Sequence, residues 1–331
     1  MNLEKKIILV TGGAGFLGGA LLRRLLASGH RVRTTVHERS IEIIHPQLEL
    51  IGADLTRIDD CARAVADCDV VIHCAAVTSG AAVIVSRPLV HVTPNVLMNT
   101  SLLEACYHAG IERFVFLSSG AAYPDTGSRP VGEDEMHAGP PHPVYFPVAS
   151  MKRFTEQLCE MWARRARPPM STVIVRPSNV YGPGDKFDPA TSHVTAALIR
   201  KVALRFCPLE VWGTGDDVRD LIYIEDFLDG LLLAARTEAP HLAVNIASGH
   251  GVSVREIVAT LLDIDGRPDA RVCFDPTKPS TIPVRLLEVE RARDVLGFAA
   301  RTSLREGLAG TLAWLRDQEA AAQPEELRRA S

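Results

Sequence analysis

The chain has 331 residues, of which 47% are hydrophobic and 23% charged, and its formal net charge is −4. This length allows one large domain and a smaller one. The lack of a basic excess argues against a nucleic-acid partner, and no apolar run reaches the roughly 18 residues that a membrane span needs. Residues 1–6 lead directly into an apolar strand, so we expect no signal peptide. Seven cysteines without a C-x-x-C pair favour a reduced, cytoplasmic protein without a bound metal.

The first predicted strand, residues 7–10, leads into a glycine-rich turn with the sequence TGGAGFLG, and a helix is expected at 16–28. Glycines allow a tight turn and a close approach of the backbone to a phosphate. The N-terminus of the following helix directs its amides and its positive dipole end at the same anion. This placement predicts a site for the pyrophosphate of a dinucleotide.

Strands and helices are predicted to alternate through residue 176. The further strands are expected at 31–36, 48–51, 69–74, 114–118 and 171–175, and the further helices at 58–66, 95–109 and 148–165. This alternation predicts an α/β fold with a doubly wound parallel sheet, of the Rossmann type, over residues 1–176.

After Arg176 the composition shifts toward Pro and Gly, and a helix at 191–206 follows. We expect a smaller C-terminal substrate-binding lobe over residues 177–316. Segments at about 224–247, namely a helix at 224–235 and a strand at 242–246, are expected to return to the first domain. Residues 317–331, rich in Ala, Glu and Arg, are expected to form a frayed or disordered tail.

The end of the second strand bears on the choice of dinucleotide. A carboxylate there would bind the ribose hydroxyls of NAD and repel the 2′-phosphate of NADP. The first position after the strand holds no acid, and His37, Arg39 and Arg33 lie nearby in the sequence. NADP is therefore favoured over NAD. Glu38 could still bind the ribose if the strand ended one residue later.

The chain resembles the extended short-chain dehydrogenase/reductase family of nucleotide-sugar enzymes, the NAD-dependent epimerases and dehydratases, and within it the branch of GDP-L-fucose synthases. The resemblance implies an NAD(P)-dependent enzyme, a nucleotide-diphosphate sugar as partner, and a homodimer built on the helices at 95–109 and 148–165, whose outward faces are not clearly apolar. The segments that carry it include TGGAGFLG (11–18), HCAA (73–76), FLSSGAAYP (116–124), RPSNVYGPGDKF (176–187), SHV (192–194), VWGTG (211–215), VRDLIYIED (218–226) and NIASG (245–249).

The resemblance also assigns a set of cofactor contacts. Asp54 and Leu55 are implied to flank the adenine, and Ala75 and Ala76 to line the path of the dinucleotide. A helix cap is an equally open reading of Asp54. The full set that we assign to the cofactor is Gly12, Gly15, Phe16, Leu17, Gly18, His37, Arg39, Asp54, Leu55, Ala75, Ala76, Lys152 and Ser178.

The catalytic group implied by the resemblance is a Ser or Thr, a Tyr, and a Lys four residues after the Tyr. A carbonyl that receives hydride must also receive a proton, and an adjacent ammonium makes the phenol a better donor. Ser119 and Lys152 match, but Val148 occupies the position of the Tyr. The proton donor is therefore missing from its place.

Tyr145 is the nearest alternative phenol before Lys152. We expect Pro147 to prevent a continuous helix from Tyr145 to Lys152, and seven helical residues would rise about 10 Å. Our hypothesis is that Tyr145 lines the pocket. The alternative is that it packs beside Phe146.

Other acid/base positions also depart from the family. Gly120 and Ala121 stand where dehydratases of the family have an Asp-Glu pair and where fucose synthase has a Cys. Neither residue can move a proton. His193 matches the histidine that works opposite that Cys and could act as a general acid or base, and a buried structural histidine is the alternative.

The substrate-binding positions look better preserved. By resemblance, cationic and aromatic side chains hold the nucleotide diphosphate and the sugar, and Arg can bind a phosphate bidentately. A surface ion pair of Arg219 with Asp217 or Asp220 is the alternative for that residue. The substrate-binding residues that we assign are Asn179, Lys201, Trp212 and Arg219.

Three functions are compatible with these residues. The first is an NAD(P)-dependent keto-sugar reductase or epimerase in which Tyr145 or water replaces the missing phenol. The second is a catalytically impaired protein that binds the cofactor and a nucleotide sugar. The third is a non-redox lyase or isomerase that uses the cofactor structurally.

Overall fold

The computed structural model describes residues 1–78, 83, 86–87, 89–189, 191–278 and 282–322. Its main feature is a seven-stranded sheet with the order β10-β6-β5-β4-β1-β2-β3, in which every pairing is parallel. The predicted doubly wound α/β fold is confirmed. The strands of this sheet are β1 (Ile7–Thr11), β2 (Arg31–Val36), β3 (Leu48–Gly52), β4 (Val70–His73), β5 (Arg113–Leu117), β6 (Ser171–Pro177) and β10 (His241–Ile246).

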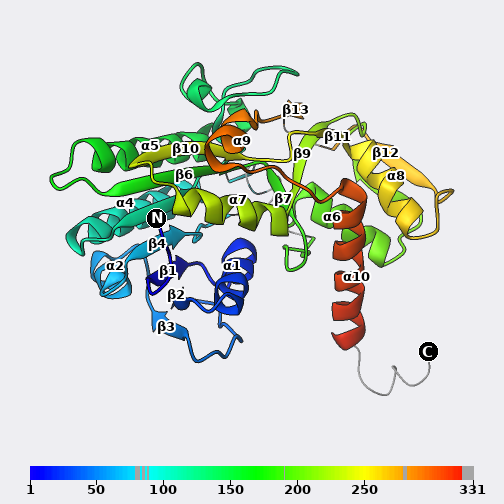
Figure 1. Cartoon of the computed structure of the whole chain (residues 1–331). Coiled ribbons are helices and arrows are strands. Elements are labelled where there is room, and N and C mark those ends of the chain that lie inside the picture. The colour runs from blue at the N-terminus through cyan, green and yellow to red at the C-terminus, as the bar shows by residue number, and fades with distance from the viewer. Residues whose placement is uncertain (79–82, 84–85, 88, 190, 279–281, 323–331) are drawn as a thin grey trace.

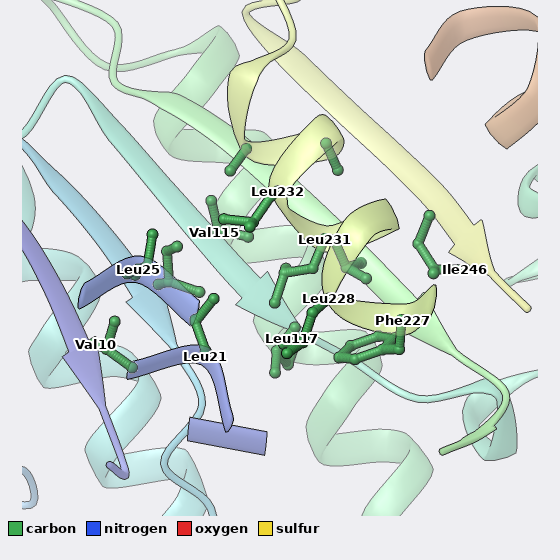
Figure 2. Close-up of a cluster of buried hydrophobic side chains, with 14 of the residues drawn as sticks. Val10, Leu21, Leu25, Val115, Leu117, Phe227, Leu228, Leu231, Leu232 and Ile246 are labelled. Atoms are coloured by element: carbon green, nitrogen blue, oxygen red, sulfur yellow. The ribbon is translucent and has the colours of Figure 1, made fainter. Parts of the chain in front are cut away.

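Helices cover both faces of the sheet (Figure 1). One face buries its apolar side chains against α1, α7 and α9, and the other against α2, α4 and α5. Figure 2 shows the first of these cores, where Leu21 and Leu25 of α1 and Leu228 and Leu231 of α7 gather over the sheet. The helices are α1 (Phe16–Ala27), α2 (Ile58–Val65), α4 (Val92–His108), α5 (Phe146–Arg164), α7 (Ile224–Arg236) and α9 (Glu290–Leu296).

The elements differ from the prediction mainly at helix ends. Helix α5 begins at Phe146, and Tyr145 is its N-cap residue. The expectation that Pro147 would interrupt a helix here is wrong, because Pro147 lies in the first turn, where its missing N–H has no helical partner to lose. Helix α4 also begins earlier than predicted, at Val92.

A second, smaller group of elements forms a lobe with its own apolar core. In this lobe β9 pairs with β7, β11 and β13, and β8 pairs with β12. The elements are β7 (Asn179–Tyr181), α6 (Val194–Ala203), β8 (Leu209–Trp212), β9 (Val218–Tyr223), β11 (Gly251–Ser253), α8 (Val254–Ile264), β12 (Val272–Asp275), β13 (Val284–Arg285) and α10 (Leu304–Ala322).

The chain crosses between the two groups more than once. Strand β10 pairs with β6, and α7 packs on the large sheet, as expected for the returning segments. Helix α9 also packs there, through Ala292. Residues 317–322 continue α10, and the rest of the expected tail lies outside the described residues.

The carboxyl ends of β1 and β4 lie side by side in the middle of the large sheet. The strand order reverses here, since β2 and β3 follow β1 on one side while β5 and β6 follow β4 on the other. Parallel α/β sheets bind ligands in the crevice at such a point. Among the described helices, none combines the length and the apolar character needed to span a membrane.

Candidate active site

A cavity of about 770 Å³ opens at the carboxyl ends of the large sheet and extends to residues of the lobe. It unites segments that are far apart in the sequence, from the glycine-rich turn to β13. The predicted residues that line it are Gly12, Gly15, Phe16, Leu17, Gly18, His37, Arg39, Asp54, Leu55, Ala75, Ala76, Ser119, Tyr145, Lys152, Ser178, Asn179, His193 and Arg219.

Two predicted substrate-binding residues, Lys201 and Trp212, do not line this cavity. The Lys201 ammonium donates to the carbonyl of Glu210 at 2.7 Å, which ties the last turn of α6 to β8. The Trp212 ring is 49% exposed, and the Lys278 ammonium lies 6.0 Å from its centre. The structure therefore does not bring Lys201 and Trp212 to the cavity residues.

The glycine-rich turn is closely packed. Gly12 has a φ of +72°, and a Cβ atom there would lie 2.7 Å from the backbone of Ala75. A Cβ on Gly18 would lie 2.2 Å from the carbonyl oxygen of Gly12. A Cβ on Gly15 would lie 3.1 Å from the carbonyl oxygen of Gly12 and 4.0 Å from the Arg39 guanidinium. At Gly12 and Gly18 the close approach of backbone to backbone thus leaves no room for a side chain.

These residues fit the pyrophosphate of a dinucleotide. Helix α1 begins at this turn with no side-chain cap and no acidic residue in its first turn, so its N-terminal amides and dipole favour an anion.

The Ser118 hydroxyl, directly after β5, is buried at the cavity wall and has no hydrogen-bond partner among the described residues.

The basic residues after β2 are divided between two environments. His37 and Arg39 line the cavity, and so does Glu38. Arg33 does not contribute there. Its guanidinium donates to Glu49 at 2.9 Å and to the carbonyl of Ala64 at 3.2 Å, at the C-terminal end of α2. A helix C-terminus attracts a cation, which explains why Arg33 turns away from the cofactor side.

Asp54 forms a turn and does not cap a helix. Its carboxylate accepts hydrogen bonds from the Thr56 amide at 3.0 Å and the Thr56 hydroxyl at 2.7 Å. These bonds lower the pKa of Asp54. Helix α2 begins at Ile58, and its N-cap residue is Arg57. The carboxylate of Asp54 is held at the cavity wall by this turn.

Lys152 lies two turns into α5, with its ammonium at the cavity wall. The ammonium donates to the carbonyl of Leu117 at 2.7 Å and lies 4.7 Å from the centre of the Phe116 ring. Burial lowers the pKa of Lys152 to about 8, against the opposing effects of Glu156 and Cys74. Ser119 is close in sequence to these partners, and its hydroxyl oxygen accepts from the Ala121 amide at 3.1 Å.

Val148 and Tyr145 lie on the same helical face as Lys152. Val148 precedes Lys152 by one turn of α5 and Tyr145 precedes it by two, a spacing that aligns side chains on one face. All three line the cavity. Of the five tyrosines in the chain, all of them within the described residues, Tyr145 alone lines it.

Tyr123 is the other phenol near Ser119 in the sequence, and it is fully buried. Its hydroxyl donates to Asn245 at 2.6 Å and accepts from the Arg176 guanidinium at 2.8 Å. Arg176 also forms a buried ion pair with Glu156 of α5 at 2.6 Å. This network joins β6, β10 and α5. The Tyr123 hydroxyl is therefore not available to a ligand in the cavity.

His193 immediately precedes α6, and its ring lines the cavity. Desolvation and the nearby Lys186 ammonium lower the pKa of His193. Two further titratable cavity residues, Asp185 and Lys186, were not predicted. Burial raises the pKa of Asp185 to about 6, and the Lys186 ammonium donates to the Thr78 hydroxyl at 2.7 Å. Both stand in the segment GPGDKF, but sequence spacing gives no direction for a loop side chain.

Arg219 lines the cavity and also forms an ion pair. Its guanidinium lies 3.2 Å from the Asp217 carboxylate and donates to the carbonyl of Val218 at 2.9 Å. No ion pair of Arg219 with Asp220 is found among the described residues. The two are consecutive in β9, where successive side chains point to opposite faces, and the Asp220 carboxylate accepts hydrogen bonds from Ser248. Arg285 is a third cavity arginine, after Arg39 and Arg219, and it was not predicted.

A buried hydrogen-bond chain connects the glycine-rich strand with α5. The Thr11 hydroxyl lies 2.7 Å from Nδ1 of His73, and Nε2 of His73 lies 2.9 Å from Oδ1 of Asn99. The Asn99 amide donates to the Thr155 hydroxyl at 2.9 Å, which in turn donates to the carbonyl of Met151 at 3.0 Å. Burial lowers the pKa of His73 to about 4, so the ring is neutral. This chain fixes α5 relative to the end of β1.

Nowhere in the described part of the chain do three or more His, Cys, Asp or Glu side chains gather in a way that could hold a metal ion.

Comparison with known proteins agrees with the parallel sheet and the cavity described above. The chain is 32% identical over 316 residues to GDP-L-fucose synthase from Sinorhizobium fredii, covering 93% of this chain and 94% of the relative. It is 32% identical to the structure of MoeE5 in complex with UDP-glucose and NAD, with a TM-score of 0.81 over 94% of this chain and 99% of the other. The UDP-glucose 4-epimerase structure from Thermotoga maritima has a TM-score of 0.84 at 27% identity, over 95% and 99% of the two chains.

The family model of the NAD dependent epimerase/dehydratase family matches residues 8–247, which hold the large sheet and nearly all of the cavity lining. From its cavity and from these matches, the chain belongs to the NAD dependent epimerase/dehydratase family.

Proposed function

We propose that this protein is an NAD(P)-dependent enzyme that reduces or epimerises a keto-sugar carried on a nucleotide diphosphate. The observation that carries the proposal is that one cavity combines the glycine-rich turn, Lys152, Ser119 and the Arg219 guanidinium. We assign cofactor binding to residues 1–176 with the returning segments 224–247, and substrate binding to residues within 177–316. The names of the relatives, a GDP-L-fucose synthase and a UDP-glucose 4-epimerase, support a nucleotide sugar as substrate.

Two groups of residues divide the work in this proposal. The cofactor part of the cavity comprises residues 12–18, 37–39 and 54–55, and it holds the dinucleotide, which supplies the hydride chemistry when bound. The substrate part comprises the reaction-centre residues Ser119, Tyr145, Val148 and Lys152 of the large domain and Asn179, His193, Arg219 and Arg285 of the lobe. In this part the Ser119 hydroxyl fixes the sugar carbonyl oxygen and the Lys152 ammonium stabilises negative charge on it.

The proton for that oxygen comes from an unusual source. Val148 has no proton to give, although it stands one turn before Lys152 on the cavity face of α5. Because the pKa of Lys152 is lowered to about 8, its ammonium is a competent acid near neutral pH. Tyr145 or a water molecule carries this proton to the sugar oxygen. His193 supplies acid/base chemistry for a ring carbon.

The cofactor is proposed to be NADP in preference to NAD. His37 and Arg39 line the cavity beyond the end of β2, where a 2′-phosphate needs cationic partners. Glu38 lines the cavity as well and would instead favour the ribose hydroxyls of NAD. Comparison of the dissociation constants of NADP⁺ and NAD⁺ decides between the two.

A homodimer built on α4 and α5 is also part of the proposal. These helices pack against each other, and they expose four large apolar side chains, Leu97 at 48%, Phe146 at 57%, Phe154 at 41% and Met161 at 53%. All seven cysteines are free thiols, which supports a reducing, cytoplasmic setting.

Turnover with and without a restored phenol tests the proposed function. GDP- and dTDP-4-keto-6-deoxy sugars are incubated with NADPH, and absorbance at the NADPH band is followed. We expect slow turnover by the wild type and none by Lys152→Met. The Val148→Tyr variant should be faster by about 100-fold or more, because a positioned general acid contributes roughly 10²–10⁴. Fast wild-type turnover that Val148→Tyr does not improve would contradict the proposal that Val148 leaves the site without its usual proton donor.

A second function, binding of NADP and a nucleotide sugar without redox turnover, is favoured by one observation. Gly120, Ala121 and Val148 all line the cavity, so three positions that carry proton-transfer groups in relatives are inert here. Activity that appears only in Val148→Tyr, together with tight ligand binding by the wild type, would establish this function in place of the first.

A further inference from the structure

The connection between β7 and α6, a loop of the lobe, passes close to the start of α1. Gly184 in this connection has a φ of +84°, and a Cβ atom there would lie 3.8 Å from the Arg23 guanidinium and 4.0 Å from the Phe16 ring. Phe16 is the first residue of α1, directly after the glycine-rich turn. Asp185 and Lys186 follow Gly184 and line the same cavity as the turn. The loop therefore borders the place where we expect the pyrophosphate.

The Lys186 ammonium connects this loop with the large domain. It donates to the Thr78 hydroxyl at 2.7 Å and to the Thr78 carbonyl at 3.4 Å. Thr78 belongs to the connection that follows β4, and both residues line the cavity. The carboxyl ends of β1 and β4 flank the point where the strand order reverses, which is where parallel α/β sheets bind their ligands. Lys186 thus reaches across this crevice from the lobe.

The hydrogen bonds of the Lys186 ammonium leave a donor for a ligand. An ammonium has three N–H donors, and among the described residues only Thr78 accepts from them. The neighbouring Asp185 carboxylate accepts from the backbone amide of Lys186 at 2.7 Å and attracts the ammonium from a longer distance. Because a half-buried cation without a close carboxylate has lost part of its hydration, a bound anion would stabilise it.

The other charges around Lys186 are mostly positive. Burial and the repulsion by Arg39 lower the pKa of Lys186, against the attraction of Asp185. Burial and the Lys186 ammonium in turn lower the pKa of His91 and that of His193. The Arg39 guanidinium also lies near the glycine-rich turn. A phosphate held between the turn and these cations would relieve their mutual repulsion.

We propose that the Lys186 ammonium binds the pyrophosphate of the dinucleotide from the lobe, while the amides of the glycine-rich turn bind it from the large domain. The cofactor is thereby coupled to the lobe. This inference rests on the proposed function, because it adds a residue to the site of the same cofactor. The position of Thr78 after β4 favours the pyrophosphate, since the 2′-phosphate is expected beyond the end of β2.

Titration of Lys186→Met tests which phosphate is bound. The probes are NADP⁺, NAD⁺, GDP-mannose and UDP-glucose, each with the protein alone. We expect NADP⁺ and NAD⁺ to weaken by the same factor of about 10- to 100-fold, because both contain the pyrophosphate, and the nucleotide sugars to be unchanged. Lys278→Met is the matched control, since Lys278 is an exposed lysine of the lobe outside the cavity.

Two milder variants separate charge from position and carry the test if Lys186→Met does not fold. Thr78→Val removes the hydroxyl that orients the ammonium, so we expect a loss of a few-fold for both dinucleotides. Lys186→Arg keeps the charge but changes its shape and reach, so its affinity for both dinucleotides should lie between those of wild type and Lys186→Met.

Hydrogen exchange tests the coupling to the lobe. NADP⁺ should slow the exchange of amides in residues 182–187 in the wild type and much less in Lys186→Met, measured with both proteins saturated. Equal protection in the two proteins would overturn the coupling.

The titrations can overturn the assignment in three ways. A loss confined to NADP⁺ would assign Lys186 to the 2′-phosphate, a loss confined to the nucleotide sugars would assign it to the substrate, and unchanged affinities would leave it no role in binding. A wild type that binds neither dinucleotide would instead contradict the proposed function.

Discussion

The cofactor part of the cavity is formed largely by backbone, whereas the substrate part is formed by side chains from several separate segments. In the cofactor part, a Cβ on Gly12 or Gly18 would overlap neighbouring backbone atoms, so few sequences can form the turn. In the substrate part, Val148 occupies a helical position without disturbing α5. Backbone geometry therefore preserves cofactor binding under strong constraint, while the reactive groups can change and leave the fold intact.

The largest effect is expected where the backbone is tightest. Gly18→Ala would place a Cβ atom 2.2 Å from the carbonyl oxygen of Gly12, so the turn must shift. We expect NADP⁺ binding to weaken by more than about 100-fold and the melting temperature to fall. Gly52→Ala is the control, because no heavy atom lies within 4 Å of a Cβ there and its φ is not positive. Normal NADP⁺ binding by Gly18→Ala would remove the contrast between the two parts.

The sequence predicted the backbone-built part better than the side-chain-built part. TGGAGFLG fixes a turn by local sterics, so both its conformation and the cavity around it could be expected. Arg33 is close to His37 and Arg39 in the sequence, but its direction depends on Glu49 and on the end of α2, which local sequence does not show. Pro147 was read as a helix breaker although a first-turn proline is compatible with a helix.

Asp185, Lys186 and Arg285 could not be predicted, because nothing local shows where they point. Asp185 and Lys186 lie in the connection between β7 and α6, and Arg285 lies in a two-residue strand. The position of Arg285 in the cavity follows from the pairing of β13 with β9, a contact between segments more than sixty residues apart. Such long-range packing leaves no periodic signal in the sequence.

The next largest effect is expected in the pH dependence of turnover, which tests Lys152 as the proton source in the substrate part. The pKa of Lys152 is lowered to about 8, so its ammonium is charged below that pH and is lost above it. If Lys152 is the proton source, kcat should fall by about tenfold per pH unit above pH 8. The profile is measured from pH 6 to 10 on the wild type and on Val148→Tyr. A rate that stays constant up to pH 10 would exclude Lys152 as the acid.

Cofactor choice is expected to show a smaller effect, because it depends on one flexible side chain beside a rigid turn. Arg39→Met should weaken NADP⁺ binding by about 10-fold and NAD⁺ binding by much less, since only NADP⁺ carries the 2′-phosphate. Fluorescence titration of both dinucleotides measures the difference. Arg31→Met is the control, since Arg31 is exposed at the opposite end of β2. Equal losses for the two dinucleotides would show that Arg39 does not recognise the 2′-phosphate.

The smallest effect on activity is expected from a break in the buried hydrogen-bond chain Thr11–His73–Asn99–Thr155, which connects the two parts of the cavity. The Asn99 amide donates to Thr155, so Oδ1 of Asn99 accepts from His73 and the proton of the neutral ring lies on Nε2. Thr155→Val removes the acceptor of the Asn99 amide and the link to α5. We expect a loss of about 1–3 kcal/mol in the free energy of unfolding, because a buried donor remains unpaired.

Thr311→Val is the matched variant for that measurement. Thr311 is equally buried, and its hydroxyl donates to the carbonyl four residues earlier in α10, as that of Thr155 does in α5, but the structure gives it no side-chain partner within the described residues. Denaturant unfolding should therefore show a larger loss for Thr155→Val. A few-fold lower kcat should accompany it in Thr155→Val alone, because Lys152 begins the same turn of α5. Equal losses of stability in both variants, with equal kcat, would mean that the buried chain does not hold Lys152 against the cofactor part.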